Sequence, residues 1–241
     1  MSQYLLNADM GEGMGNDAVL MPHLDLANIA CGFHASNPQL MAEAVQLAVR
    51  HGVQVGAHPS YRDRVNFGRV EQQLSNIELQ HIIQEQVTSL RAICQAQQTD
   101  VAYLKPHGAL YHQMMRANQP QIMETILQCM QRQLPDCPLV VMAVPRDAWL
   151  QKLAAQYSVP IWREVFADRR YQDDGSLLPR THAEAVLQDP DEIIQQIALL
   201  TQHQQVKTHT QNTLSITADT LCLHGDNPAA AIALQGYQAV S

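Results

Sequence analysis

The chain alternates between short apolar runs and longer amphipathic segments. The short runs have the continuous apolar character of strands that are buried on both faces of a parallel sheet. The segments between them place apolar residues three and four positions apart, which is the pattern of a helix with one buried face. Seven strands are predicted in this way, one beginning at Tyr4 and the others at 26–31, 53–57, 101–104, 139–144, 160–167 and 221–223.

Local signals define several helices between these strands. Asn37 followed by Pro38 is a helix start, and Gly52 ends that helix. Ser75 and Glu78 have the spacing of a capping box before a long amphipathic helix. Further helices are predicted at 119–132, 146–156 and 190–202 and after residue 228, and a short helical bridge at 18–24.

The alternation of strands and helices predicts an α/β fold with a parallel sheet closed into a (β/α) barrel, and an open doubly wound sheet is the alternative. The 241 residues suit one such domain, and no linker divides them. We therefore expect a single barrel domain over 1–241. Polar alternation at 206–218 predicts a small β-hairpin insertion.

The composition of the chain argues against two classes of binding partner. The net charge is −8 and no basic cluster is present, which argues against nucleic acid or an anionic membrane surface. The start of the sequence lacks the regions of a signal peptide and no apolar run is long enough to span a membrane, so a cytoplasmic location is expected. Five cysteines without C-x-x-C spacing indicate reduced thiols.

Polar residues cluster where the predicted strands end, and the carboxyl ends of parallel strands meet on one face. Each such histidine could merely cap a strand, but several together favour a site. Imidazoles and carboxylates are suited to binding a divalent ion, to acid/base catalysis or to both. The residues in question are Asn7, Asp9, Glu12, His34, His58, His107, His224 and Asp226.

Cationic residues lie near the same strand ends. Lys105 stands between Leu104 and Pro106 at the end of a buried strand, where a lysine that is merely exposed to solvent is unusual. Arg69, Arg169 and Arg180 are further candidates for holding an anion, although each alone could form a surface ion pair. No familiar phosphate-binding loop is present. Cys31 and Cys222 are more consistent with inert strand thiols than with nucleophiles.

Seven blocks of the sequence together resemble the LamB/YcsF family. They occur in the family's order and span nearly the whole chain, which makes the resemblance specific. The blocks are Asn7–Glu12, Ala27–Ala35, Val55–Tyr61, Lys105–Tyr111, Glu164–Arg169, Asp174–Leu177 with Pro179 and Arg180, and Cys222–Asp226.

The resemblance implies a distorted (β/α) barrel related to the polysaccharide-deacetylase superfamily. Because the family includes the A subunit of bacterial ATP-dependent 5-oxoprolinase, it also implies cleavage of 5-oxo-L-proline to L-glutamate coupled to ATP hydrolysis. Separate B and C subunits are the implied partners, and ATP and a divalent metal, Mg²⁺ being favoured, are the implied cofactors.

Residue chemistry then suggests roles at these positions. Asp9, Glu12, His34, His58, Lys105 and His107 are expected to be catalytic, and Asp9, Glu12 and His58 are candidate metal ligands. Asn7, Arg69, Asp168, Arg169, Arg180, His224 and Asp226 are expected to bind substrate or nucleotide. Two alternatives remain open at the level of sequence: an autonomous metal-dependent hydrolase of the deacetylase type, and a non-catalytic metabolite-binding protein.

Overall fold

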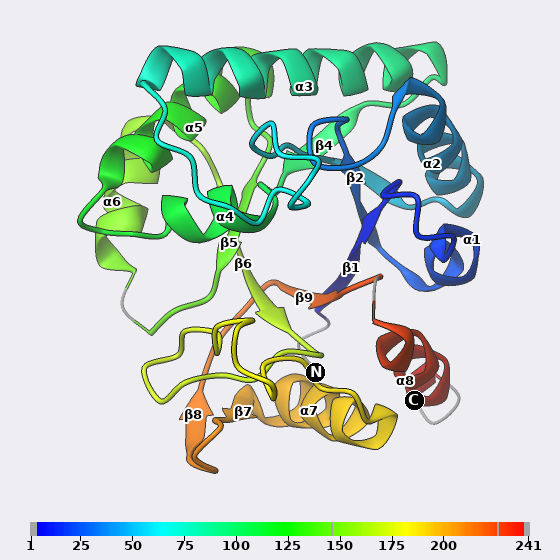
Figure 1. Ribbon diagram of the computed structural model, residues 1–241, viewed down its shortest axis with the longest axis vertical. Helices are drawn as coiled ribbons and strands as arrows, with labels where there is room; N and C mark the ends of the chain where they lie inside the picture. The colour runs from blue at the N-terminus through cyan, green and yellow to red at the C-terminus, as the bar shows by residue number, and fades with distance from the viewer. Residues whose placement is uncertain (1–3, 146, 226, 239–241) are drawn as a thin grey trace.

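The computed structural model describes residues 4–145, 147–225 and 227–238. Their helices and strands follow one another in the alternating order that the sequence predicts (Figure 1). The elements are β1 Leu5–Met10, α1 Asp17–Leu20, η1 Met21–His23, β2 Leu26–Ala30, α2 Pro38–His51, β3 Gln54–His58, α3 Asn76–Ala96, β4 Val101–Leu104, α4 Gly108–Met114, α5 Pro120–Gln133, β5 Leu139–Met142, α6 Ala148–Gln156, β6 Ile161–Phe166, α7 Pro190–His203, β7 Gln205–Lys207, β8 Thr213–Ser215, β9 Thr220–Leu223 and α8 Pro228–Gln238.

Seven strands of the described chain form a closed barrel in the order β1-β2-β3-β4-β5-β6-β9. Every neighbouring pair is parallel, including β9 with both β1 and β6, which closes the ring. The predicted (β/α) barrel is therefore confirmed, and the open doubly wound sheet is excluded.

The barrel is irregular on one side. The register between β3 and β4 shifts between Val55 and Gly56. Strands β4 and β5 share a single register pair, Leu104 with Leu139. This side of the barrel therefore has less backbone pairing than the rest, and side chains must contribute more to its closure.

The helices lie outside the ring of strands, with α2 and α3 on one side of the barrel and α7 and α8 on another (Figure 1). The predicted ends of two of them are confirmed. The side chain of Asn37 accepts a hydrogen bond from the Leu40 N–H at the start of α2, and Gly52 ends that helix with φ of 70°. Ser75 and Glu78 form the reciprocal hydrogen bonds of a capping box at the start of α3.

Inside the barrel, apolar side chains close the end at which the strands begin. Leu26, Tyr103 and Val140 form a buried cluster of their own, and Leu5 and Trp162 pack against it. Gly56 pairs in register with Tyr103, and a Cβ at Gly56 would overlap the tyrosine ring. The glycine therefore makes room for the ring that fills this end of the barrel.

The short helix α4 was not predicted from the sequence. It begins at Gly108, which has φ of +55° and lies so close to another loop that a Cβ would come 2.5 Å from the Gly68 carbonyl oxygen. The Ala109 N–H donates to that same oxygen at 2.9 Å. The start of α4 is therefore fixed by a contact between two loops. Such a contact cannot be recognised from the pattern of neighbouring residues in the sequence.

Outside the barrel, β7 and β8 pair antiparallel as a two-stranded hairpin next to α7. In the described part of the chain, no helix has the length and apolar character needed to cross a membrane.

Candidate active site

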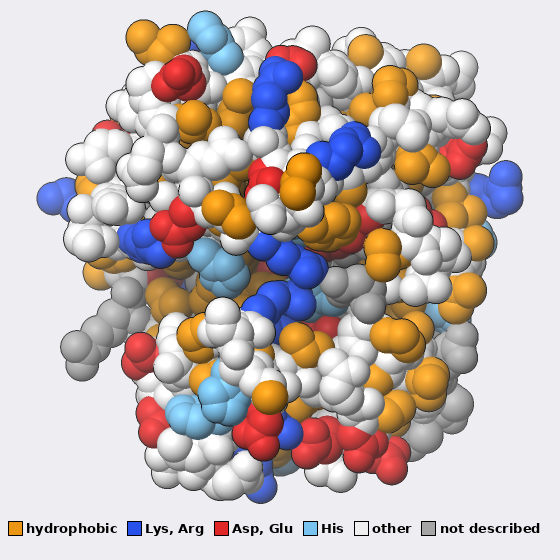
Figure 2. Space-filling view, viewed as in Figure 1, with side chains coloured by type: hydrophobic (Ala, Val, Ile, Leu, Met, Phe, Trp, Pro, Cys, Tyr) orange, Lys and Arg blue, Asp and Glu red, His pale blue; other side chains and the backbone are white. Residues whose placement is uncertain are grey.

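A pocket of about 690 Å³ opens where the barrel strands end. Nine predicted site residues line it: Asp9, Glu12, His58, Arg69, Lys105, His107, Arg169, Arg180 and His224. The predicted residues Asn7, His34 and Asp168 are buried behind these side chains. Asp226 lies outside the described residues. In Figure 2, lysine and arginine side chains gather around a hollow near the centre of the face shown.

Lys105 forms the centre of a polar network inside the barrel. Its side chain is almost completely buried, and its Nζ lies 2.9 Å from Glu164 Oε1 and 3.3 Å from Asp9 Oδ1. Burial disfavours the charged ammonium, but the carboxylates of Asp9 and Glu164 outweigh this effect and hold the pKa of Lys105 well above 10.5. Lys105 is therefore a fixed positive charge and not a proton acceptor at neutral pH.

Asp9 is the carboxylate that connects this network to the histidines. Its Oδ1 lies 3.3 Å from His58 Nε2 and accepts a hydrogen bond from the Asn28 amide at 2.9 Å. Burial would raise the pKa of Asp9, yet His58 and Lys105 lower it well below 3.8. Asp9 is therefore an ionised carboxylate at the floor of the pocket.

Asn7 supports the network from within the barrel. Its Oδ1 accepts hydrogen bonds from Lys105 Nζ at 3.1 Å and from the Asn28 amide at 2.8 Å, and its own amide donates to Thr220 Oγ1 at 2.7 Å. These contacts give Asn7 a positioning role beneath the pocket.

Glu164 belongs to the site and was missing from the residues singled out by sequence. It has no exposed surface, and its Oε2 accepts a hydrogen bond from the Tyr111 hydroxyl at 2.9 Å. The signal was present, because Glu164 is a charged residue within a predicted buried strand, the same anomaly that identified Lys105. Lys105 and Glu164 form an ion pair, which explains why two charged side chains are buried here.

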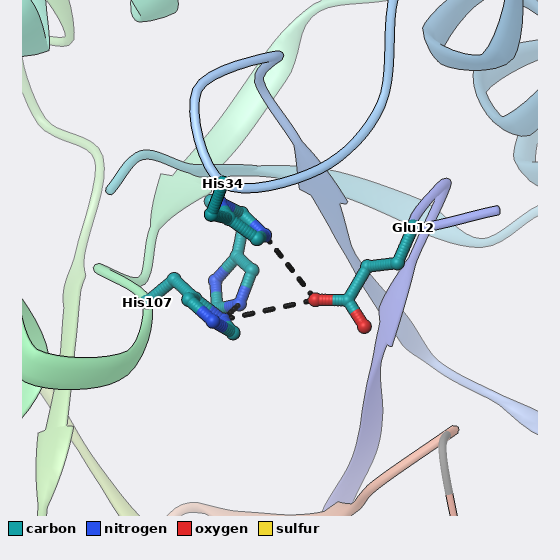
Figure 3. A group of neighbouring side chains, drawn as sticks. Glu12, His34 and His107 are labelled. Carbon is teal, nitrogen blue, oxygen red and sulfur yellow. Dashed lines mark hydrogen bonds and ion pairs between the residues drawn. The ribbon is translucent and has the colours of Figure 1, made fainter. Parts of the chain in front are cut away.

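Three histidines meet above this network. His34 and His107 stack with ring centroids 3.8 Å apart, and both rings point toward the Glu12 carboxylate (Figure 3). His58 Nε2 lies 2.9 Å from His107 Nδ1. Burial and the neighbouring histidines hold the pKa values of His34 and His107 well below 6.5, so both rings are neutral at pH 7.

One donor atom from each of Glu12, His34, His58 and His107 lies within 4.8 Å of the others, so this group could hold a metal ion. The group contains two of the three ligands suggested by sequence, Glu12 and His58. Asp9 is not part of it. The two additional imidazoles make this donor set richer in nitrogen than the one expected.

A second histidine unit lies on another wall of the pocket. His224 Nδ1 lies 2.8 Å from Asp168 Oδ1, and the Asn227 amide donates to Asp168 Oδ2 at 3.2 Å. Although burial opposes ionisation, His224, Asn227 and Arg169 lower the pKa of Asp168 below 3.8. The ionised Asp168 accepts a hydrogen bond from the Nδ1–H of His224, which orients the ring so that Nε2 is the nitrogen that can exchange protons with a molecule in the pocket.

The three arginines at the pocket differ in their contacts. Arg169 is buried, and it donates to the backbone carbonyls of Ala185 and Leu178 at 3.1 and 2.9 Å. Burial and the nearby Arg180 lower the pKa of Arg169 to about 10, so it stays charged at neutral pH. Arg169 thus shapes the segment that carries Arg180, whereas Arg69 and Arg180 are exposed at the mouth of the pocket.

Cys31, which directly follows β2, and Cys222 in β9 are not activated nucleophiles. Burial raises the pKa of Cys31 to about 12. Burial also raises the pKa of Cys222 well above 9, despite the Lys105 ammonium 3.1 Å from its sulfur. Both are protonated thiols at neutral pH, as the sequence analysis favoured.

Fold and site together define a seven-stranded parallel (β/α) barrel with a pocket of convergent carboxylates, histidines and cations at the carboxyl ends of its strands. Residues 4–240 match the sequence profile of the LamB/YcsF family. The chain belongs to this family, as its seven sequence blocks predicted.

Individual relatives agree with this assignment. The chain is 44% identical to the A subunit of 5-oxoprolinase from Vibrio parahaemolyticus over 93% of this chain and 90% of that protein. It is 41% identical to the A subunit of 5-oxoprolinase from Pseudomonas fluorescens strain Pf-5 over 98% and 95% of the two chains. The crystal structure of the lactam utilization protein from Thermus thermophilus superposes with a TM-score of 0.88 and 33% identity, covering 99% of this chain and 96% of that one.

Proposed function

We propose that this chain is the A subunit of an ATP-dependent 5-oxoprolinase, which opens the lactam ring of 5-oxo-L-proline to give L-glutamate. The observation that carries the proposal is the match, over nearly the full length of both chains, to relatives named as the A subunit of 5-oxoprolinase. The proposal includes partner B and C subunits, ATP as co-substrate and a cytoplasmic location.

The chemistry of the substrate suits the pocket. 5-Oxoproline carries a carboxylate, and an arginine guanidinium binds a carboxylate through paired hydrogen bonds. Arg69 and Arg180 at the pocket mouth are the cations that we assign to this carboxylate or to a phosphate group. Arg169 positions the segment that bears Arg180 through its bonds to Leu178 and Ala185.

The lactam itself is an unactivated amide, which explains the coupling to ATP. Transfer of a phosphoryl group to the lactam oxygen would create a leaving group and expose the ring carbon to attack by water. In this scheme ATP arrives as its Mg²⁺ complex, because Mg²⁺ prefers phosphate and carboxylate oxygens.

The buried groups divide into charge stabilisation and proton transfer. Lys105 supplies a permanent positive charge at the pocket floor, where charge that develops on an oxygen would be stabilised. His224, oriented by Asp168, is assigned to proton transfer at the ring nitrogen or the attacking water. We assign Asp9, Glu12, His34, His58 and His107 to a second catalytic group, in which Asp9 contacts both Lys105 and His58.

The test is ATP hydrolysis that depends on 5-oxoproline, with glutamate quantified, for this protein alone and mixed with its B and C subunits. We expect glutamate only in the complete mixture with ATP. Replacing this protein by the His224→Gln variant in the mixture serves as the site control and is expected to abolish glutamate formation. Absence of glutamate from a mixture of folded subunits would refute the proposal. Release of glutamate or acetate by this protein alone without ATP would favour an autonomous hydrolase instead.

A further inference from the structure

We infer that Glu12, His34, His58 and His107 form a binding site for one borderline transition-metal dication of the Zn²⁺ class, distinct from the Mg²⁺ that accompanies a nucleotide. The inference concerns this chain alone and does not depend on the proposed activity.

The hydrogen bonds of His58 and His107 fix which ring nitrogens carry protons. His58 Nδ1 lies 2.6 Å from the Lys105 carbonyl oxygen, and His107 Nε2 lies 2.9 Å from the Phe67 carbonyl oxygen. Because a backbone carbonyl can only accept, each of these nitrogens must donate. In a neutral ring the other nitrogen then carries a lone pair.

The remaining nitrogens of the two rings face each other. His58 Nε2 and His107 Nδ1 are 2.9 Å apart, with Glu12 Oε1 3.7 Å from His107 Nδ1 and Asp9 Oδ1 3.3 Å from His58 Nε2. Two neutral rings would place facing lone pairs among carboxylate oxygens, which is unfavourable unless a cation, either a proton or a metal ion, lies between the two nitrogens. The two rings are thus arranged to hold a cation.

The same hydrogen bonds are those that orient metal-bound histidines. A ligating imidazole commonly donates its second N–H to a backbone carbonyl or a carboxylate, which fixes its tautomer and its direction. His58 and His107 both have this partner, and they come from different segments of the barrel, one at the end of β3 and one before α4.

The spacing suits a small dication better than a shared proton. A proton between His58 and His107 would need only those two nitrogens, whereas four donor atoms converge within 4.8 Å. The His34 Nε2 to Glu12 Oε1 distance of 3.2 Å and the other two distances of 2.9 and 3.7 Å bracket the roughly 3.4 Å edge of a tetrahedral site with metal–nitrogen bonds of about 2.0–2.1 Å.

The donor types select the class of ion. Three imidazoles and one carboxylate suit Zn²⁺, Fe²⁺ and related ions, whereas Mg²⁺ prefers a set made of oxygen atoms. Glu12, His58 and His107 also line the pocket, so a bound ion would face it with any remaining coordination position. A zinc ion held by all four groups would be closed, as in a structural site, whereas an ion held by three of them would keep one position open to the pocket, as in a catalytic site.

The three histidine ligands are not expected to contribute equally to metal binding. The second nitrogen of His34 is buried without a hydrogen-bond partner among the described residues, so its tautomer is not fixed as it is for the other two histidines. We expect His58→Gln and His107→Gln to weaken metal binding at least tenfold, because even the loss of a group that only orients a ligand typically costs roughly 10–100-fold in metal affinity, and we expect His34→Gln to weaken it less.

The test measures metal directly on the purified full-length chain, without partner subunits or substrate. Metal content is determined by mass spectrometry after purification without chelators, and Co²⁺ is titrated into stripped protein while its visible spectrum is followed. About one equivalent of bound ion per chain is expected, with a Co²⁺ spectrum that millimolar Mg²⁺ does not displace. The exposed His81 on α3 provides the matched control, and His81→Gln should bind as the parent does.

Two results would overturn the inference. The first is folded parent protein that retains no metal and gives no saturable Co²⁺ spectrum. The second is a folded His58→Gln variant that binds Co²⁺ as tightly as the parent. Because neither readout involves 5-oxoproline or ATP, failure of this inference is distinguishable from failure of the proposed function.

Discussion

Lys105 Nζ lies 2.9 Å from Glu164 Oε1 in the interior of the barrel, and the contact joins the end of β4 to β6. Both side chains are buried, and a second carboxylate, Asp9, shares the same ammonium. Removing this ammonium would leave two buried carboxylates without the charge that compensates them.

Replacement of Lys105 by methionine should therefore destabilise the protein. Removing one partner of a buried ion pair leaves an uncompensated charge and typically costs about 3–5 kcal/mol. We expect a loss of this size in the free energy of unfolding, measured by urea denaturation. The double variant Lys105→Met with Glu164→Gln should recover part of the loss, and a double variant as unstable as the single one would contradict the ion-pair explanation.

Arg180 allows substrate binding to be separated from stability. Its guanidinium is exposed at the pocket mouth and has no ion-pair partner among the described residues. With the complete set of subunits, Arg180→Gln should raise KM for the anionic substrate roughly tenfold, because a hydrogen bond to a charged group contributes about 1.5–3 kcal/mol. Its melting temperature should stay within error of the parent.

The matched control for Arg180 is Arg132→Gln on α5, another exposed arginine outside the pocket. Its KM should equal that of the parent. If both substitutions raise KM equally, the effect comes from overall charge and not from the pocket.

Asp168 should make the protein sensitive to acid. Its pKa in the folded state lies below the ordinary value of 3.8, so the unfolded chain binds more protons at this residue as the pH falls past 4. The stability that it contributes is present above about pH 4 and is lost as the pH falls through the folded pKa. In Asp168→Asn, the free energy of unfolding should depend less steeply on pH below about pH 4, as chemical denaturation at several pH values would measure. An unchanged slope would mean that Asp168 does not contribute to acid sensitivity.

Gly108 should be intolerant of alanine. Both its positive φ and the nearby Gly68 carbonyl oppose a Cβ, so Gly108→Ala should cost more than the roughly 1–3 kcal/mol of backbone strain alone. Gly15 is the matched control, since its φ is +80° but no described atom lies within 4 Å of the position that an added methyl group would take. Thermal unfolding should show a clearly larger loss for Gly108→Ala than for Gly15→Ala, and equal losses would show that the loop contact is unimportant.

The barrel could be predicted from sequence because its determinants are local. Apolar runs, helix caps such as Asn37 and the Ser75 capping box each depend on residues a few positions apart. The parallel order of the strands then follows from their alternation with helices. The helix α4 escaped prediction because the contact of Gly108 with Gly68 joins segments forty residues apart.

Only part of the site could be predicted, again because sequence patterns report on residues that are close together in the chain. Polar residues at strand ends could be recognised one by one, and the barrel brought most of them to one pocket. Their pairing could not be read from the sequence. The register of the barrel strands is needed to tell which positions face the interior of the barrel. In the structure, Glu164 contacts Lys105, and Asn7 lies beneath the pocket rather than at its surface.

The sparse pairing between β4 and β5 gives the interior network a second role. Lys105 contacts Asn7 and Asp9 from β1, Glu164 from β6 and Cys222 from β9, so it ties the strand with the least backbone pairing to the far side of the ring. The residues at the pocket floor therefore also stabilise the closed barrel. We therefore expect a lineage of this protein that acquires a new substrate to exchange side chains at the rim, such as Arg69 and Arg180, because each change at the floor also weakens the closure of the barrel.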